Sequence, residues 1–318
     1  MRRNPAPPDK FEDQTSAELK RFSKLNDGVT MEECDSKCES CATRGTCTDP
    51  KKEMDEQMRA VSARMGRIKN KIMIASGKGG VGKSTVAVNL ARSLQSLGFR
   101  VGVLDADITG PSTAKLLGVE ASRLSGGPEG IEPVDSKGLK VISMAFALSG
   151  TDSAVVWRGP MKMAAIKQFM SDVNWGDLDF LIIDLPPGTS DEPLSVVQLL
   201  PDLSGAVIVT TPQEVALLDS RKAVNMAKSM NVPLLGIVEN MSGLRCPHCG
   251  EVLEIFKTGG GERAAEELGV PFLGAIPLDP EVAPLGDSGI AFVEKETAAK
   301  KSFEKVVDRL LDELKKRR

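Results

Sequence analysis

The chain has 318 residues, 41 % of them hydrophobic and 27 % charged, with a formal net charge of −3. This composition is typical of a globular protein with one large domain and an appendage, and its slight acidity argues against a nucleic-acid or anionic-membrane partner. Since no apolar run reaches the roughly 20 residues that span a bilayer, and prolines replace the apolar core of a signal peptide, we expect a cytoplasmic protein.

The first 69 residues divide into three segments. Residues 1–30 are polar and proline-bearing, so we expect a disordered tail. Residues 31–69 form a cysteine-bearing segment that has too few apolar side chains for a core, so a metal has to organise it. Its last part, 51–68, places apolar residues three and four apart, which predicts an amphipathic linking helix.

Residues 70–318 alternate short apolar runs with helical patterns, which predicts an α/β domain. This alternation is typical of a doubly wound, mostly parallel sheet with helices on both faces. The expected strands are 71–76, 101–104, 180–185, 205–210, 233–240 and 271–276, and the expected helices include 82–97, 112–117 and 294–316. Ligands of such folds bind at the carboxyl ends of the strands.

A glycine-rich segment, GKGGVGKST, follows the first of these strands and opens a helix. It fits the P-loop pattern G-x-x-x-x-G-K-[ST], in which backbone N–H groups and a helix N-terminus bind phosphate. In such a loop Lys83 contacts the β- and γ-phosphates and Ser84 holds Mg²⁺. The expected nucleotide-binding residues are Gly77, Lys78, Gly79, Gly80, Val81, Gly82, Lys83, Ser84 and Thr85. The chain has no N-K-x-D guanine signature, so ATP is favoured over GTP.

Carboxylates stand at the ends of two further strands. Asp105 and Asp107 follow strand 101–104, and Asp184 lies near the end of strand 180–185. A carboxylate at such a strand end beside a phosphate loop holds Mg²⁺, usually through water. We therefore assign Mg²⁺ to Asp184, and the attacking water to Asp107 with Asp105 in support.

Two of the six cysteines, Cys246 and Cys249, form a CPHC motif. This spacing is common in zinc and iron–sulfur sites, but two thiolates do not complete a tetrahedral site. The single histidine, His248, lies between them and is poorly placed to ligate the same metal. The remaining ligands come either from the N-terminal cysteines or from a second copy of the chain, because a two-fold dimer supplies four thiolates. A redox-active dithiol is a further alternative.

The other four cysteines, Cys34, Cys38, Cys41 and Cys47, lie within 14 residues. Four thiolates complete a metal site by themselves. Thiolate-only ligation suits both a [4Fe–4S] cluster and zinc, and the spacing alone leaves both open.

The phosphate loop resembles that of the deviant P-loop class that includes MinD, ParA and the nitrogenase iron protein. The resemblance rests on the extra lysine of the loop, Lys78. It implies a homodimer in which Lys78 reaches the nucleotide of the partner subunit, as an arginine finger does.

Over about residues 70–315 the chain resembles the Mrp/ApbC-type P-loop ATPases of iron–sulfur cluster assembly. The matching stretches are GKGGVGKST, LDADITGPS, WRGPM, DLPPGTSDEPLS, VENMSG, CPHC and GAIPLDP. The resemblance implies ATP hydrolysis, a [4Fe–4S] cluster bridging Cys246 and Cys249 of two subunits, and its transfer to apo-proteins. It also implies that Asn240, Pro277 and Asp279 bind the base.

The N-terminal cysteines resemble those of longer members of this family, which carry a second [4Fe–4S] cluster. The short spacing between Cys34 and Cys38 departs from those members, whereas C-x2-C-x5-C matches. Two other classes compete with the cluster carrier: a MinD- or ParA-like positioning ATPase, and a nucleotide switch that zinc stabilises.

Overall fold

The computed structural model of the chain describes residues 50–147, 159–189, 191–200, 202–245, 249, 251–253 and 255–317. The expected tail of residues 1–30 and the four N-terminal cysteines lie outside these ranges. The chain divides into two compact units, Met1–Glu53 and Met54–Arg318. The second unit contains the phosphate loop and every strand of the described ranges.

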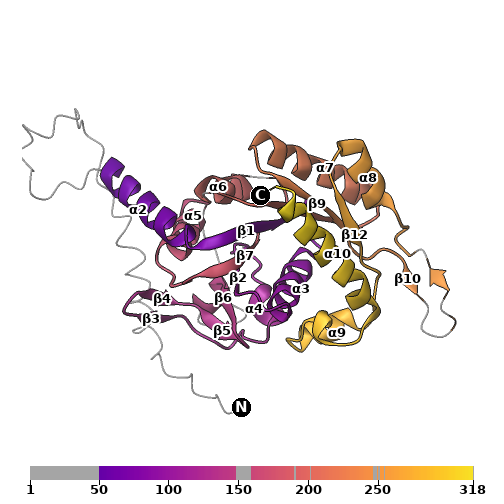
Figure 1. Cartoon of the computed structure of the whole chain (residues 1–318), viewed down its shortest axis with the longest axis horizontal. Coiled ribbons are helices and arrows are strands. Elements are labelled where there is room, and N and C mark those ends of the chain that lie inside the picture. The colour runs from indigo at the N-terminus through magenta and orange to yellow at the C-terminus, as the bar shows by residue number, and fades with distance from the viewer. Residues whose placement is uncertain are drawn as a thin grey trace, which may run out of the picture. The chain divides into compact units, whose positions relative to one another are not determined.

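One eight-stranded sheet, in the order β12-β9-β8-β1-β7-β2-β6-β5, forms the centre of this unit (Figure 1). Its strands are β1 (Ile68–Ala75), β2 (Val101–Asp105), β5 (Val134–Ser136), β6 (Leu139–Ile142), β7 (Leu178–Asp184), β8 (Gly205–Thr210), β9 (Leu234–Glu239) and β12 (Phe272–Ala275). All neighbours are parallel except β5, which pairs antiparallel with β6 at one edge. Every residue of β8 and β9 is buried, as expected of parallel strands that are covered on both faces.

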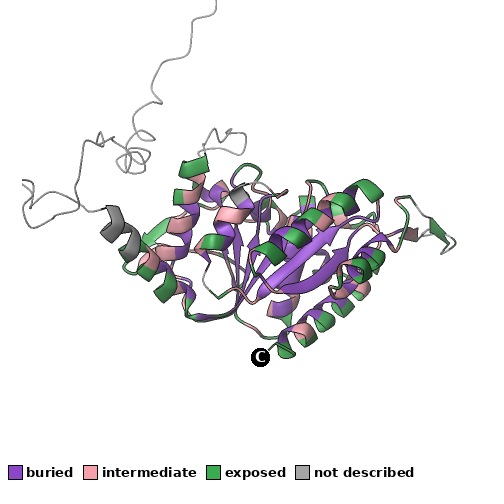
Figure 2. Ribbon diagram, turned by 90° about the horizontal axis from the view of Figure 1, so that it is seen from above, coloured by how far each residue is buried: buried purple, intermediate pink, exposed green. Residues whose placement is uncertain are grey.

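Helices cover both faces of the sheet, and Figure 2 shows the buried strands between helices whose outer sides are exposed. The helices are α2 (Pro50–Met65), α3 (Lys83–Ser96), α4 (Thr113–Leu116), α5 (Gly159–Ser171), α6 (Asp191–Leu199), α7 (Glu214–Ser229), α8 (Gly260–Leu268), α9 (Val282–Asp287), α10 (Ala298–Lys315) and the 3₁₀ turns η1 (Met144–Ala147) and η2 (Phe292–Glu294). One apolar layer contains side chains of α2, α5, α6, α7 and α8, and the other those of α3, α4 and α10. The predicted doubly wound architecture is confirmed.

The expected linking helix corresponds to α2, and its last turns belong to the core of the second unit. Val61 and Met65 are fully buried. The buried ammonium of Lys71 on β1 donates to the carbonyls of Met65 and Ile68, at 3.2 and 3.4 Å. Burial lowers the pKa of Lys71. The lysine thus satisfies the Met65 carbonyl at the end of α2 and the Ile68 carbonyl at the start of β1.

Strands β5 and β6 of the main sheet were not among the expected strands, and neither were two short antiparallel pairs. These pairs are β3 (Ser125–Gly127) with β4 (Gly130–Glu132), and β10 (Leu244–Arg245) with β11 (Val252–Leu253). Strands of two or three residues are too short to show a period in the sequence. The second pair forms the two sides of a hairpin that carries the CPHC motif and projects from the end of the sheet (Figure 1).

The parallel strands bring several predicted functional segments to one edge of the sheet. β1, β2, β7 and β9 all end there, and they lead into the phosphate loop, the Asp105–Asp107 segment, the loop after Asp184 and Asn240. The described part of the chain contains no helix that is both long and apolar enough to cross a membrane.

Candidate nucleotide and metal-binding site

The phosphate loop between β1 and α3 has the shape that its glycines allow. Gly80 and Gly82 have φ angles of 79° and 82°, in the left-handed region that glycine tolerates best. A Cβ on Gly77 would lie 2.1 Å from the backbone of Asp219 on α7, whereas one on Gly79 would meet nothing within 4 Å. The loop is therefore closely packed against α7 at its start and open in its middle.

A cavity of about 390 Å³ lies against this loop. Its lining residues include Ser76, Lys78, Gly79, Gly80, Gly82, Lys83, Ser84, Thr85, Asp107, Gly110, Ser112, Lys115, Pro187 and Asp287. The structure thus brings most of the sequence-predicted phosphate-binding residues to one cavity, together with Asp107.

Lys83 and Asp184 form a buried ion pair at this cavity. The Lys83 ammonium donates to one carboxylate oxygen of Asp184 at 2.5 Å, and it lies 3.4 Å from the Ser84 hydroxyl. The other oxygen of Asp184 accepts from the Thr113 hydroxyl at 3.4 Å. A buried carboxylate needs such partners to remain charged. The cation expected to bind phosphate and the carboxylate expected to hold Mg²⁺ are therefore in direct contact.

Asp105 is fully buried next to this ion pair. One of its oxygens accepts from the backbone N–H of Asp107 at 3.1 Å, and the other from the Ser143 hydroxyl at 3.0 Å and the backbone N–H of Thr113 at 3.3 Å. Burial raises the pKa of Asp105 to about 8, and the negative charge of Asp184 adds to the rise. Asp105 therefore shapes the segment that bears Asp107. Neither Thr113 nor Ser143 was predicted, since each hydroxyl gains its role only through the tertiary contact.

The raised pKa of Asp105 predicts a pH-dependent stability of the nucleotide-free protein. Between its ordinary pKa of 3.8 and about 8, the folded protein binds more protons than the unfolded chain, so its stability falls as pH rises. We expect Asp105 to lower the free energy of unfolding by about 2 kcal/mol between about pH 6 and about pH 8. Urea denaturation in chelator at both pH values measures this, and Asp105→Asn is expected to lack this loss. Equal pH dependence of both proteins would contradict the assignment.

Asp107 and Lys78 both line the cavity but are held differently. One carboxylate oxygen of Asp107 accepts from the backbone N–H of Gly110 at 3.2 Å. The carbonyl of Lys78 accepts from the Ser76 hydroxyl at 2.9 Å. The residue is half-buried, and its ammonium forms no ion pair with any residue in the described ranges. The N–H of Gly188, after β7, donates to the Ser76 carbonyl at 2.9 Å, which joins that loop to the phosphate loop.

The three residues expected at the base do not line this cavity. Asn240 is buried, and its amide donates to the carbonyl of Val81 in the phosphate loop at 2.9 Å. One oxygen of Asp279 accepts from the backbone N–H of Glu281, just before α9, and the other from that of Ala299, in the first turn of α10. Pro277 lines a second cavity of about 600 Å³ between the cysteine hairpin and α10.

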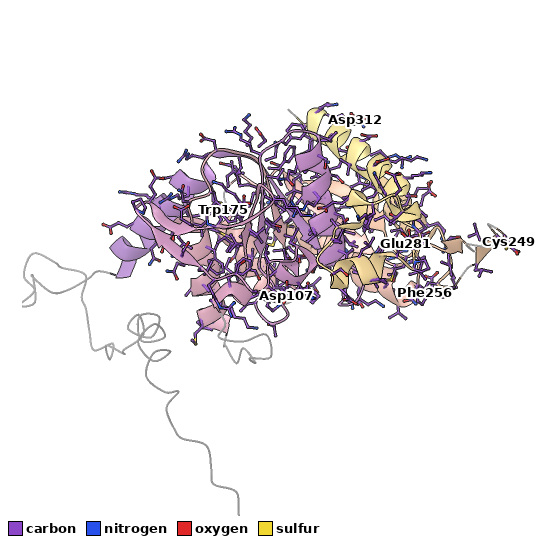
Figure 3. All side chains as sticks on the ribbon, turned by 90° about the horizontal axis from the view of Figure 1, so that it is seen from below. Asp107, Trp175, Cys249, Phe256, Glu281 and Asp312 are labelled. Carbon is purple, nitrogen blue, oxygen red and sulfur yellow. The ribbon has the colours of Figure 1, made fainter. Side chains whose placement is uncertain are left out.

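The CPHC motif lies between β10 and β11. Cys249 is an exposed free thiol, and Figure 3 shows it far from Asp107, at the tip of the hairpin. Cys246 and His248 lie outside the described residues, as do Cys34, Cys38, Cys41 and Cys47. An exposed thiol at the tip of a projecting hairpin is accessible to a ligand from outside the molecule.

A parallel sheet whose first strand enters a GKGGVGKST loop, with Lys83 beside a strand-end carboxylate, defines a P-loop NTPase. Within that class, residues 67–311 match the family model of the ParA group described as NUBPL iron-transfer P-loop NTPase. The chain belongs to this iron-transfer family. The iron–sulfur ATPase family predicted from the sequence is thereby confirmed.

Relatives agree with this assignment. The iron-sulfur cluster carrier protein of Methanocaldococcus jannaschii is 51 % identical over 285 residues, which cover 89 % of this chain and 98 % of that protein. A nucleotide-binding protein from Archaeoglobus fulgidus, solved in complex with ADP and with cobalt, has a TM-score of 0.67 and 39 % identity over 76 % of this chain and 95 % of its own. The cell division ATPase MinD of Pyrococcus furiosus has a TM-score of 0.57 and 25 % identity, over 76 % of this chain and 98 % of its own. The predicted MinD/ParA-like fold is confirmed.

Proposed function

We propose that this protein is an ATP-hydrolysing carrier that holds a [4Fe–4S] cluster between the Cys246 and Cys249 pairs of two subunits and delivers it to apo-proteins in the cytoplasm. The observation that carries the proposal is a half-set of metal ligands on an exposed hairpin of a P-loop NTPase. Two thiolates per chain require a second chain to complete a four-thiolate site. The similarity to the M. jannaschii cluster carrier protein supports the same cargo.

The cavity at the phosphate loop is the proposed site of ATP hydrolysis. Lys83 leaves Asp184 to bind the β- and γ-phosphates, because a polyphosphate offers it more negative charge than one carboxylate. Ser84 and the freed Asp184 would hold Mg²⁺, which neutralises charge on the β- and γ-oxygens. Asp107 orients or deprotonates the attacking water, and Asp105 positions its backbone.

The homodimer is proposed from Lys78 and from the surface beside it. The Lys78 ammonium is without an ion-pair partner in the described chain, although it lines the cavity. The neighbouring helix α7, which touches the loop at Asp219, exposes Val215 and Leu218 to 65 % and 61 %. Large exposed apolar side chains beside a site indicate a protein contact. A second subunit would cover them and receive Lys78 at its nucleotide.

Two further roles are proposed from the sequence. The N-terminal set of Cys34, Cys38, Cys41 and Cys47, in the segment 31–69, holds a second [4Fe–4S] cluster, with zinc as the alternative. Asn240, Pro277 and Asp279 border the base, with Asn240 acting in addition on the phosphate loop.

Metal analysis of anaerobically purified protein tests this function. Iron and acid-labile sulfide are measured, with Mössbauer and EPR spectra, in the presence and absence of ATP. The proposal predicts a coloured protein that binds iron and sulfide and passes them to an apo-protein that requires a [4Fe–4S] cluster. A colourless protein that contains zinc only contradicts it and favours the nucleotide switch.

A further inference from the structure

Two consecutive residues at the end of β9 contact the two functional parts of the molecule. Asn240 contacts the phosphate loop, whereas Glu239 contacts the Ser242 hydroxyl before the cysteine hairpin and two backbone N–H groups after it. The contact of Asn240 joins residues 159 positions apart, and those of Glu239 with Gly259 and Gly261 join residues 20 and 22 positions apart, so neither residue's contacts follow from the sequence.

Glu239 joins the two ends of the hairpin where it leaves the sheet, called its feet below: Ser242 on one side, and Gly259 and Gly261 on the other. Its side chain is fully buried, and one oxygen accepts from the Ser242 hydroxyl at 2.5 Å and the N–H of Gly259 at 3.0 Å. The other oxygen accepts from the N–H of Gly261 at 2.5 Å. Ser242 precedes β10, whereas Gly259 and Gly261 follow β11 at the start of α8.

Among the described residues, the partners of this carboxylate are hydrogen-bond donors without a full charge. No cation in the described ranges pairs with Glu239, so three hydrogen bonds and the positive end of α8 offset the cost of its burial. A Cβ on Gly261 would lie 2.9 Å from the Cβ of Glu239. The contact is therefore close, and a displacement of Glu239 displaces both feet of the hairpin.

Asn240 is equally close to the phosphate loop. Its amide nitrogen donates to the Val81 carbonyl at 2.9 Å and would lie 2.2 Å from a Cβ on Gly82. The N–H and C=O of a trans peptide point in opposite directions, so this bond directs the N–H of Gly82 away from Asn240. Asn240 thereby sets the orientation of a peptide that lines the phosphate cavity.

The backbone of Glu239 and Asn240 is held in place on both sides. The N–H of Asn240 donates to the Thr210 carbonyl of β8 at 2.7 Å, and the N–H of Ile276 donates to the Glu239 carbonyl at 2.8 Å. The dipeptide is thus hydrogen-bonded to both neighbouring segments of the sheet. Rigid elements of this kind carry coupling between sites when both sites bias them.

We propose that Glu239 and Asn240 are positioning residues that couple the nucleotide site to the cysteine hairpin within one subunit. Phosphate binding orders the peptide between Val81 and Gly82, which restrains Asn240 and, through the shared backbone, Glu239. Glu239 then holds Gly259 and Gly261 more tightly, so the feet of the hairpin open less often. This coupling rests on the proposed function only in that ATP binds the loop.

Hydrogen exchange of the metal-free full chain, with and without Mg²⁺ and ATP, tests the coupling. Peptides that cover the phosphate loop report nucleotide binding, and peptides that cover 242–261 report the hairpin. We expect ATP to slow exchange at Gly259 and Gly261 by about fivefold or more, the lower end of typical coupling between sites. Glu239→Gln is expected to lose this hairpin response while ATP still protects the phosphate loop.

Three further variants separate this mechanism from others. Lys78→Ala is expected to keep the hairpin response, because the coupling runs inside one subunit. Ser242→Ala, which removes one of the three hydrogen bonds, is expected to weaken the response. Asp179→Asn alters a carboxylate that also accepts a backbone N–H, that of Arg100, but far along the sheet, and is expected to leave the response unchanged.

The coupling is overturned if Glu239→Gln retains the wild-type response, or if only Lys78→Ala abolishes it. It is also overturned if ATP protects the phosphate loop of the wild type and the hairpin does not respond. None of these results bears on iron binding, which metal analysis judges separately.

Discussion

Replacement of Lys78 by alanine is expected to lower kcat for ATP hydrolysis by about 10³-fold, the lower end of the effect of a charge supplied in trans. The physical reason is that a cation inserted into a closed site stabilises the charge that develops on the transferred phosphoryl group. ATP binding is expected to change little, because Lys83, Ser84 and the loop backbone remain. Steady-state hydrolysis and equilibrium ATP binding measure the two quantities. Lys69→Ala, which removes an exposed lysine paired with Asp179, is the matched control.

A mixture of two inactive variants shows whether Lys78 acts in trans. In a dimer of Lys78→Ala with Lys83→Ala, the site that retains Lys83 receives the intact Lys78 of the other subunit. An equal mixture is expected to regain about one quarter of wild-type activity, since half of its dimers are mixed and each of these has one complete site. A mixture that stays inactive would show that Lys78 serves its own nucleotide, and the proposed contact between subunits would be wrong.

Replacement of Cys249 by serine is expected to abolish the bridging cluster, with a loss of about four irons per dimer. A serine hydroxyl is a far weaker ligand for iron than a thiolate, and the dimer loses two of its four thiolates at once. In the proposed arrangement the N-terminal cysteines hold a cluster of their own, so they are expected to retain their metal. Iron and sulfide content of anaerobically reconstituted wild type and variant measures the difference.

Stability and nucleotide binding provide the control for this variant. Cys249 is exposed, and substitutions at exposed positions usually change stability by no more than about 0.5 kcal/mol. Metal-free Cys249→Ser is therefore expected to unfold and to bind ATP as the wild type does. If the variant kept the full iron content of the wild type, the hairpin would not be the cluster site.

The phosphate loop could be predicted from the sequence because its chemistry is local. Nine consecutive residues contain the glycines that permit the backbone conformation of the loop, together with the phosphate-binding lysine and the hydroxyl that holds Mg²⁺. The helix that follows supplies the dipole. The sheet was predictable for a similar reason, because each buried parallel strand is a nearly continuous apolar run, as in GAVIVT and LLGIVE. Family membership followed from the same short stretches.

The base-binding residues show where local reasoning ends. Asp279 was expected beside a nucleotide, and its carboxylate caps the start of α10. Asn240 was expected at an adenine edge, and its amide contacts the phosphate loop itself. In both cases the residue type allows several partners. The tertiary structure adds a contact that the sequence did not predict, and binding of the base stays a prediction.

The sequence was thus sufficient to predict the phosphate loop, the α/β fold and a cysteine pair that provides only half of a four-thiolate site. Each of these depends on neighbours in sequence or on a simple period. The tertiary structure alone decided that Lys83 pairs with Asp184, that Asp105 is enclosed by Thr113 and Ser143, and that Glu239 and Asn240 lie between the loop and the hairpin. Such contacts join residues 8 to 159 positions apart, and they form because parallel strands bring their carboxyl ends to one edge of the sheet.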